Sequence, residues 1–187
     1  MSFMAVTGVT GCGKTLAMVF LMLRNYVLKN RRIFSNFHFH RDPIIAFLSQ
    51  YYERDFFDYE YIEDSSQMEK LRDGVFFGDE LWSWLDSRMS GKPSNRTKSI
   101  FLLKLRKRGV DVIYSCQMIH TMEKRIRENT EFEAEPILVK NNKVCILNIY
   151  SLNTATQKRI KKLDTFKFDC PPLWEMYDTE EEIEPEY

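Results

Sequence analysis

A phosphate-binding loop near the amino terminus is the most specific chemical pattern in the sequence. Residues 8–15 match the Walker A pattern at every fixed position, and they follow an apolar run and open a helical pattern. In such a loop, backbone N–H groups surround a β-phosphate, Lys14 reaches the β- and γ-phosphates, and the Thr15 hydroxyl ligates Mg²⁺. A glycine-rich turn without a ligand is the alternative. The residues predicted to bind ATP are Gly8, Val9, Thr10, Gly11, Cys12, Gly13, Lys14 and Thr15.

Two consecutive acids follow an apolar strand pattern at residues 74–78, as in a Walker B motif. A strand that ends here places Asp79 at the carboxyl edge of a sheet, where its carboxylate can hold the Mg²⁺ shell. Glu80 then faces the γ-phosphate and can polarise the attacking water. Capping of the next helix is the alternative role of both acids. The pair favours a hydrolase that carries its own base over a small-molecule kinase or a GTPase.

Further side chains could act on the γ-phosphate. Gln117 closes the apolar strand pattern 111–116, so its amide could orient water and report hydrolysis, although such a residue is often only part of a loop. Arg108, and then Arg106, are the preferred candidates for an arginine that a neighbouring subunit supplies to neutralise charge on the transferred phosphoryl group. Arg88 is a third candidate. The alternative for these arginines is a solvated basic face.

The elements that must position these residues alternate between strands and helices. Apolar runs predict strands over 3–7, 32–37, 75–77 and 110–116. Helical spacing and capping residues predict helices over 14–29, from Asp42-Pro43, over 100–108 and over 121–129. Residues 137–140 and 144–150 flank Asn141-Asn142, which predicts a hairpin with a two-residue turn. The alternation indicates an α/β fold with a mostly parallel sheet and helices on both faces.

Length and charge divide the chain into a body and a tail. The 187 residues suffice for one domain, predicted over 1–170. Residues 171–187 begin with two prolines and end with six acids and no base. We therefore expect a partly disordered tail that lacks the apolar content to pack and is dispensable for hydrolysis. The chain is formally neutral with 27 basic and 27 acidic residues, so without these six acids the body is basic.

The basic excess lies in two clusters. Eight Lys or Arg and no acid occur between Ser87 and Val110, and the polar segment 87–99 is a candidate for DNA contact. The second cluster is Lys158-Arg159-Ile160-Lys161-Lys162. Solvated helix faces and loops are the alternative for each cluster.

Composition excludes several classes of protein. Hydrophobic residues make up 44% and charged residues 29% of the chain, as in soluble globular proteins. No apolar run approaches the ~20 residues that span a bilayer, and the amino terminus has no secretory signal pattern. The four cysteines lack the spacing of a zinc or redox site and fit small buried side chains in a reducing compartment. We therefore expect a cytoplasmic protein, with Cys12 a passive side chain.

These motifs together resemble the FtsK–HerA superfamily of P-loop ATPases. The resemblance covers residues 1–130 and includes the zonula occludens toxin-like (Zot-like) ATPases of filamentous phages and the packaging ATPases of membrane-containing viruses. It implies a RecA-like fold, a ring oligomer (commonly a hexamer) and arginine fingers that act across subunits. The resemblance rests on residues 8–15, Ser35-Asn36, Asp79-Glu80, the segment 105–113 leading to Gln117, and the following Arg125-Ile126-Arg127.

The resemblance implies an ATP-driven translocase that packages a double-stranded viral DNA genome, with a capsid protein as partner. It would work in the host cytoplasm and transiently at the capsid vertex. The alternative is a Zot-like ATPase that drives export of virions or protein together with a membrane protein of the virion. Zot-like assembly proteins generally carry a transmembrane helix and a further domain, and this sequence shows neither, which favours packaging. A nucleotide-binding regulatory subunit is a third class, but binding alone requires neither Glu80 nor Gln117.

Overall fold

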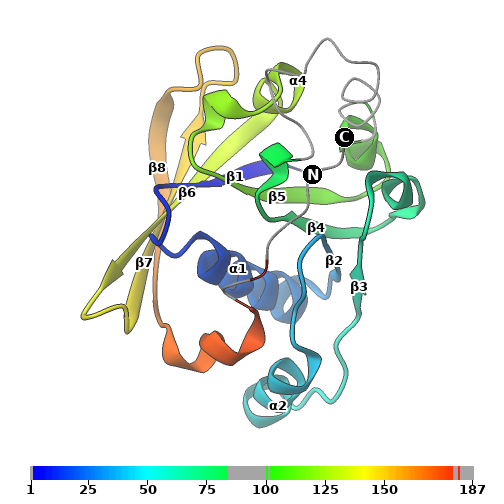
Figure 1. Cartoon of the computed structure of the whole chain (residues 1–187), viewed down its shortest axis with the longest axis vertical. Coiled ribbons are helices and arrows are strands. Elements are labelled where there is room, and N and C mark those ends of the chain that lie inside the picture. Colours follow the sequence, from blue (N-terminus) through cyan, green and yellow to red (C-terminus); the bar gives the residue numbers. More distant parts are fainter. Residues whose placement is uncertain (1, 84–99, 101, 179–180, 182–187) are drawn as a thin grey trace.

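The computed structural model describes residues 2–83, 100, 102–178 and 181 of the chain (Figure 1). The strands are β1 (Phe3–Thr7), β2 (Arg32–Ser35), β3 (Tyr59–Tyr61), β4 (Gly74–Gly78), β5 (Asp111–Cys116), β6 (Thr130–Val139), β7 (Val144–Leu152) and β8 (Arg159–Asp169). The α-helices are α1 (Lys14–Lys29), α2 (Arg41–Tyr52), α4 (Lys124–Arg127) and residues 102–107. The 3₁₀ helices are η1 (Ser65–Lys70), η2 (Leu81–Ser83), η4 (Ile119–Thr121) and η5 (Pro171–Met176).

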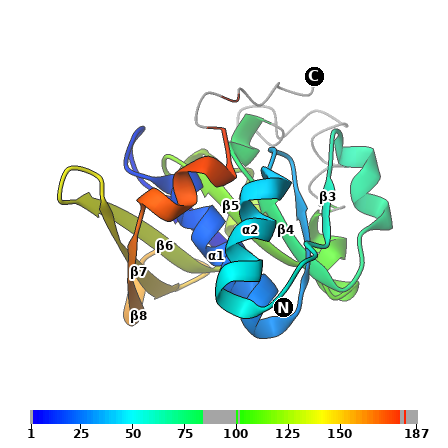
Figure 2. The ribbon, with the colours of Figure 1, turned by 90° about the horizontal axis from the view of Figure 1, so that it is seen from below.

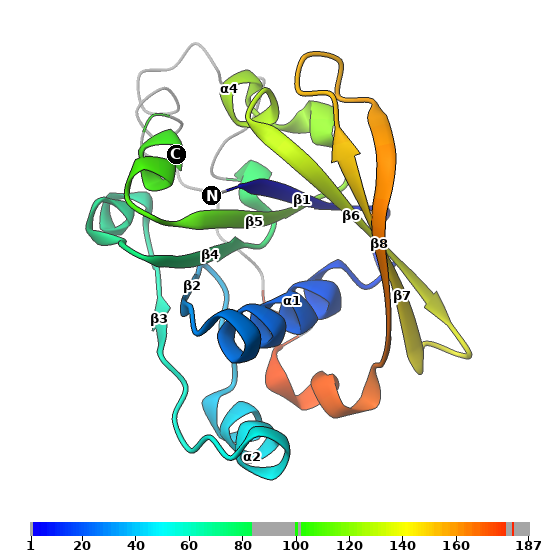
Figure 3. The same ribbon diagram turned by 180° about the vertical axis from the view of Figure 1, so that it is seen from behind.

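All eight strands join in one sheet, in the order β3-β2-β4-β5-β1-β6-β7-β8. The strands from β3 to β6 are parallel, and β7 and β8 extend the sheet in the antiparallel sense (Figure 3). The predicted mostly parallel α/β fold and the hairpin near the carboxyl terminus are therefore confirmed. Because the parallel strands end at a common edge, the residues that follow β1, β2, β4 and β5 are brought together there.

The hairpin turns at the two asparagines. The Lys143 N–H donates to the Lys140 carbonyl across 3.2 Å, and Asn141 and Asn142 have φ values of 54° and 65°. Positive φ at both central residues is typical of hairpin turns. Lys140 also has a positive φ, of 53°, and the strands end at Val139 and Val144, so the connection spans residues 140–143 and is longer than the predicted two residues. The flanking strands are longer than predicted, since β6 begins at Thr130.

Apolar side chains cover both faces of the sheet. On one face, α1, α2 and η5 pack in a layer over Val6, Phe77 and Ile113 (Figure 2). On the other face, residues 102–107 and α4 pack in a second cluster that includes Phe76 and Tyr114. The central strands are thus buried on both sides, which explains why their sequences are continuous apolar runs.

Three segments differ from the sequence-based predictions. The predicted helix over 121–129 is only the single turn α4, because η4 precedes it and β6 begins at residue 130. The edge strand β3 (Tyr59–Tyr61) is not among the four strands predicted from apolar runs. Residues 159–162 belong to β8 and not to a helix face or loop. Edge strands expose much of their surface, so β8 lacks the apolar pattern by which the central strands were found.

The carboxyl-terminal segment packs further than predicted. Leu173, Met176 and Tyr177 are buried, and Tyr177 forms a β-bridge with Phe39. Burial raises the pKa of the Tyr177 phenol to about 12. The expectation that the residues after Pro172 lack the apolar content to pack is therefore wrong as far as Tyr177. The domain boundary after residue 170 and the dispensability of the acids beyond remain predictions.

We expect Met176→Ala to lower the free energy of unfolding by about 2–5 kcal/mol, because it leaves a cavity under η5. Glu175→Ala is the matched control, since Glu175 is the exposed neighbour and its change should stay within about 0.5 kcal/mol. Urea unfolding of both variants measures the difference. Equal unfolding midpoints would show that η5 is not part of the core.

Candidate functional site

The phosphate-binding loop lies between β1 and α1 and depends on three glycines. Gly8, Gly11 and Gly13 have φ values of 146°, 79° and 93°, which side chains rarely tolerate. A Cβ on Gly8 would lie 2.5 Å from Cys12 Sγ. Glycine therefore avoids backbone strain at all three positions, and at Gly8 it also avoids a collision with Cys12. The structure places the whole predicted motif, residues 8–15, at the carboxyl edge of the sheet.

Lys14 is held over the loop. Its side chain is buried, and Nζ donates to the carbonyls of Gly8 and Val9 at 3.1 and 3.3 Å. Burial raises the pKa of the Cys12 thiol, although the Lys14 charge opposes this shift. The thiol is therefore neutral at pH 7, which agrees with a passive role for Cys12.

The Walker A and Walker B residues meet at the start of α1. Thr15 Oγ1 donates to Asp79 Oδ2 across 2.8 Å, and Ser115 Oγ from β5 donates to Asp79 Oδ1. A hydroxyl and a carboxylate are the oxygen ligands that Mg²⁺ prefers, and Mg²⁺ on a nucleotide needs only one or two protein ligands. No group of three or more His, Cys, Asp or Glu side chains that could hold a metal occurs among the described residues. Thr15 and Asp79 therefore fit an ion that is held mainly by phosphates.

Two residues that sequence reasoning did not assign to the site position Asp79 and Glu80. The Asn36 amide donates to the Asp79 carbonyl at 3.0 Å and accepts from the Asp79 N–H at 2.7 Å. Ser115 Oγ accepts from the Glu80 N–H at 2.8 Å and so holds Glu80 at a φ of 43°. Asn36 was noted only as part of the family resemblance. Both Asn36 and Ser115 are polar residues at or just past the end of a strand beside β4, and this position could have identified them as site residues.

Gln117 approaches the loop as predicted from its strand. β5 lies between β1 and β4, so the residue that follows it lies between the two motifs. Gln117 Nε2 is 3.4 Å from Thr10 Oγ1. The structure thus brings together Lys14, Thr15, Asp79, Glu80 and Gln117 at one edge of the sheet.

The two candidate arginine fingers lie elsewhere. They are at the end of helix 102–107, where the chain enters the amino end of β5, opposite the loop of the same chain. Arg108 donates to the Glu69 carbonyl at 2.8 Å, and Arg106 pairs with Glu131 at 3.3 Å. An action on the nucleotide of a neighbouring subunit remains a prediction. Arg88 and the segment 87–99 lie outside the described residues.

A charged network adjoins the first residue before the loop. Thr7 Oγ1 donates to Glu133 Oε1 at 2.6 Å, and Arg159 Nε donates to Glu133 Oε2 at 2.7 Å. Arg159 also donates to Glu135 at 2.9 Å and lies 4.1 Å from the centre of the Tyr150 ring. Burial opposes ionisation of Glu133, but the hydrogen bonds from Arg159 and Thr7 outweigh it and lower the pKa of this carboxyl. Glu133 is therefore ionised beside the loop.

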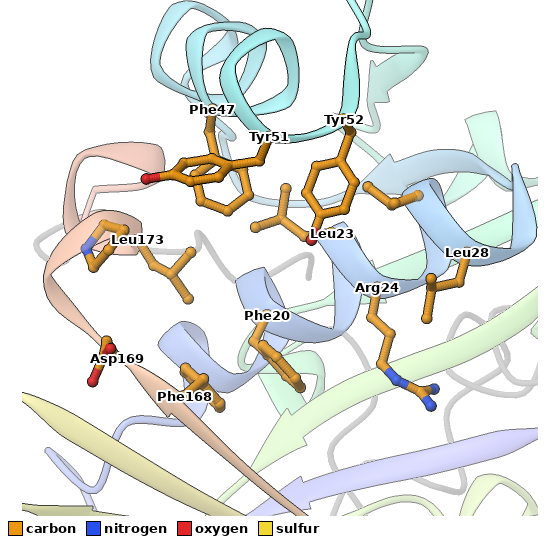
Figure 4. Close-up of a pocket in the computed structure, with 12 residues that line it drawn as sticks. Phe20, Leu23, Arg24, Leu28, Phe47, Tyr51, Tyr52, Phe168, Asp169 and Leu173 are labelled. Carbon is orange, nitrogen blue, oxygen red and sulfur yellow. The ribbon is translucent and has the colours of Figure 1, made fainter.

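A separate apolar groove lies between α1, α2 and the β8–η5 junction (Figure 4). It has a volume of about 410 Å³, and its charged lining residues are Arg24 and Asp169. None of the residues 8–15 lines it, so the phosphate chemistry belongs to the loop and not to this groove. Its apolar walls include Phe20, Leu23, Leu28, Phe47, Tyr51, Tyr52, Phe168 and Leu173.

The sequence profile of the zonular occludens toxin (Zot) family matches residues 2–167. The chain belongs to the Zot family. No curated sequence matches this Zot-family chain. Its fold is similar to the amino-terminal domain of zonular occludens toxin from Neisseria meningitidis, with a TM-score of 0.56 and 16% identity over 95% of this chain and 98% of that one.

Viral proteins share the fold of the Zot-family chain. It is similar to the genome packaging NTPase B204 of Sulfolobus turreted icosahedral virus 2 in complex with ATP-gammaS. The TM-score is 0.55 and the identity 10%, over 87% of this chain and 97% of that one. The DNA-packaging ATPase B204 of Sulfolobus turreted icosahedral virus gives a TM-score of 0.53 and 12% identity over the same shares. These likenesses establish the P-loop NTPase fold.

We expect Asn36→Ala to weaken the Mg²⁺-dependent part of nucleotide binding by about 10- to 100-fold, as is usual when a partner that orients a metal ligand is lost. Mg²⁺ titrations with a non-hydrolysable ATP analogue measure this effect. Asn25→Ala is the control, because Asn25 is also buried but its side-chain amide donates to the Leu21 carbonyl within α1, away from Asp79. If both variants bound Mg²⁺-nucleotide like the unaltered chain, Asn36 would have no role in positioning Asp79.

Proposed function

We propose that the Zot-family chain is an ATP-hydrolysing DNA translocase that packages a viral genome into a capsid. The observation that supports this most is the 2.8 Å contact between Thr15 and Asp79, which joins the two nucleotide motifs next to Glu80 and Gln117. Similarity to proteins described as a genome packaging NTPase and a DNA-packaging ATPase supports the choice of substrate. The active form is a ring oligomer, commonly a hexamer in this superfamily.

Each site residue has a role that its position supports. Mg²⁺-ATP, when bound, supplies the phosphoryl group and a cation that neutralises part of its charge. Lys14, which now donates to two loop carbonyls, would donate to phosphate oxygens instead, and Thr15 and Asp79 would hold the ion. Glu80 accepts a proton from the attacking water, and the Gln117 amide orients that water.

The partners follow from the same proposal. Double-stranded viral DNA is the cargo, further copies of the chain form the ring, and a capsid or membrane protein of the virion is the docking partner. The protein acts in the host cytoplasm and transiently at the capsid vertex.

A second candidate is a membrane-associated ATPase that drives export of virions or protein. Membership of the Zot family favours it. Within the described residues, no helix combines the length and the apolarity that crossing a membrane requires. In this candidate the chain docks on a separate membrane protein.

We expect double-stranded DNA to raise the ATPase rate of the Zot-family chain. Glu80→Gln should retain ATP but hydrolyse it at least about 100-fold more slowly, because the base is lost while the phosphate cradle is intact. Lys14→Ala should abolish nucleotide binding or hydrolysis. The test is to measure phosphate release and nucleotide affinity of the unaltered chain, Glu80→Gln and Lys14→Ala, each with and without DNA.

Two outcomes would contradict this proposal. Normal turnover by Glu80→Gln would remove Glu80 from the chemistry. Stimulation by lipid vesicles or a membrane partner, but not by DNA, would instead support the export ATPase.

We expect an arginine from a neighbouring subunit to be needed for hydrolysis but not for nucleotide binding. Arg108→Ala and Arg106→Ala should each preserve nucleotide binding, and at least one should remove most of the hydrolysis. Fingers supplied in trans contribute about 10³–10⁵ in rate in GTPases, or about 4–7 kcal/mol. An Arg→Ala subunit mixed with a Lys14→Ala subunit forms some interfaces with both groups intact, so mixed rings should recover activity. Rings that contain both subunits and stay inactive would show a structural or DNA-contacting role.

A further inference from the structure

The first half of β8 is an exposed, basic edge strand. It is the last strand of the sheet and pairs only with β7 among the described strands. Lys158, which precedes it, and Lys161 and Lys162 within it are exposed, and none forms an ion pair with another described residue. The acids of this strand, Asp164 and Asp169, lie in its second half. We name Lys158, Arg159, Lys161 and Lys162 the basic edge surface.

Two irregularities interrupt the pairing of this strand with β7. The register of β7 and β8 shifts between Ile149 and Tyr150 and again between Ser151 and Leu152. Such bulges bend and twist the edge and re-aim its side chains. Lys162 lies opposite Tyr150, and the Tyr150 ring also carries the Arg159 guanidinium. Lys162 and Arg159 therefore share one face of the sheet, whereas Lys161, opposite Ser151, lies on the other face, so the cations surround the exposed edge.

A continuous chain of polar contacts joins this surface to the phosphate-binding loop. Arg159 binds Glu133 through two N–H groups, at 2.7 and 3.1 Å, and Glu133 accepts from Thr7 at 2.6 Å. Thr7 is the last residue of β1 and directly precedes Gly8. Glu133 is almost fully buried, whereas the Arg159 side chain is 38% exposed. One end of the chain of contacts is thus open to a ligand and the other touches the nucleotide loop.

We propose that the basic edge surface binds DNA phosphates and that Arg159, through Glu133 and Thr7, transmits this contact to the phosphate-binding loop. This inference rests on the proposed DNA translocase and names the surface and the residues that couple DNA to hydrolysis. Lys158, Lys161 and Lys162 pair with no acid among the described residues and so fit a polyanion, because each releases counterions when it meets a phosphate.

Competition for one guanidinium explains the coupling. Arg159 neutralises two carboxylates, Glu133 and Glu135, so this group of three carries an excess negative charge. A phosphate beside Arg159 competes with the more exposed Glu135 for the guanidinium. Any shift of Arg159 also moves Glu133, which holds the Thr7 hydroxyl. Arg159 is therefore a positioning residue and does not touch the reacting atoms.

Protection of the sheet edge is the competing explanation for the lysines, because natural edge strands often carry Lys to prevent pairing with other chains. It accounts for the charges but not for the connection of Arg159 to Thr7. It also predicts a different result for lysine replacement, namely aggregation with unaltered DNA affinity.

The surface is tested with the Lys158→Gln, Lys161→Gln, Lys162→Gln triple variant in full-length protein. We expect its affinity for double-stranded DNA to fall by about tenfold or more, and the slope of log affinity against log salt to fall by about 2–3. Lys29→Gln, Lys70→Gln, Lys143→Gln is the matched control, since these lysines are exposed on other parts of the chain. Thermal unfolding confirms that both variants are folded, and the control keeps its affinity and slope.

The connection to the loop is tested by the ratio of ATPase rates with saturating and with no DNA. Arg159→Gln should bring this ratio close to one, and Thr7→Val should do the same while it leaves the ion pair and the edge surface intact. The variant that combines Arg159→Gln and Thr7→Val should lose no more of the DNA stimulation than either single variant does. Such non-additivity is expected for members of one chain of contacts. Thr7→Val also provides the test if Arg159→Gln fails to fold because Glu133 is left buried without its cation.

The outcomes separate this inference from the proposed function. A wild-type chain that neither binds DNA nor responds to it would overturn both. If DNA stimulates the wild-type chain but the triple variant keeps its affinity and slope, the basic edge surface is wrong and edge protection is the better explanation. If Thr7→Val retains full stimulation, the coupling through Glu133 is wrong.

Discussion

The Thr15 hydroxyl and the Asp79 carboxylate meet at 2.8 Å only because the amino end of α1 and the carboxyl end of β4 are held at one edge of the sheet. β1 and β4 are not neighbours, since β5 lies between them. The separation leaves room for the loop and places Ser115 and Gln117 between the two motifs. The parallel pairing of these strands is therefore what makes a nucleotide site out of residues far apart in sequence.

Burying polar groups at this edge of the sheet costs free energy, and hydrogen bonds offset that cost. Asn36 satisfies both the N–H and the carbonyl of Asp79, and Ser115 supports Glu80 in a left-handed conformation that costs about 1–2 kcal/mol. Glu133 is a buried anion whose charge is compensated by Arg159. The elements around the loop thus combine an apolar core on each face with a polar rim in which Asn36, Ser115 and Arg159 bind the acids.

The central strands, α1, the hairpin turn and the residues of both nucleotide motifs could be predicted from the sequence, because buried strands and glycine loops have local signatures. β8 could not, since an exposed edge strand carries no apolar pattern, and its role depends on pairing with β7. Asn36 and Ser115 act through contacts with Asp79, 43 and 36 residues away, which no local pattern encodes. The burial of Leu173 and Met176 could not be predicted, because the prolines and acids around them are typical of a disordered tail.

The place of β1 in the sheet also constrains how the protein is made. Its neighbours are β5 and β6, and already Ser2 bonds to Asp111, 109 residues later. Pairings of this length are closed late, because the entropy of a long loop must be overcome before the contacts form. During synthesis the phosphate-binding loop is made before β5 and β6, so it stays without its strand partners until both have left the ribosome. The nascent protein therefore cannot hold nucleotide in its finished site before residue 139, the end of β6, has been synthesised.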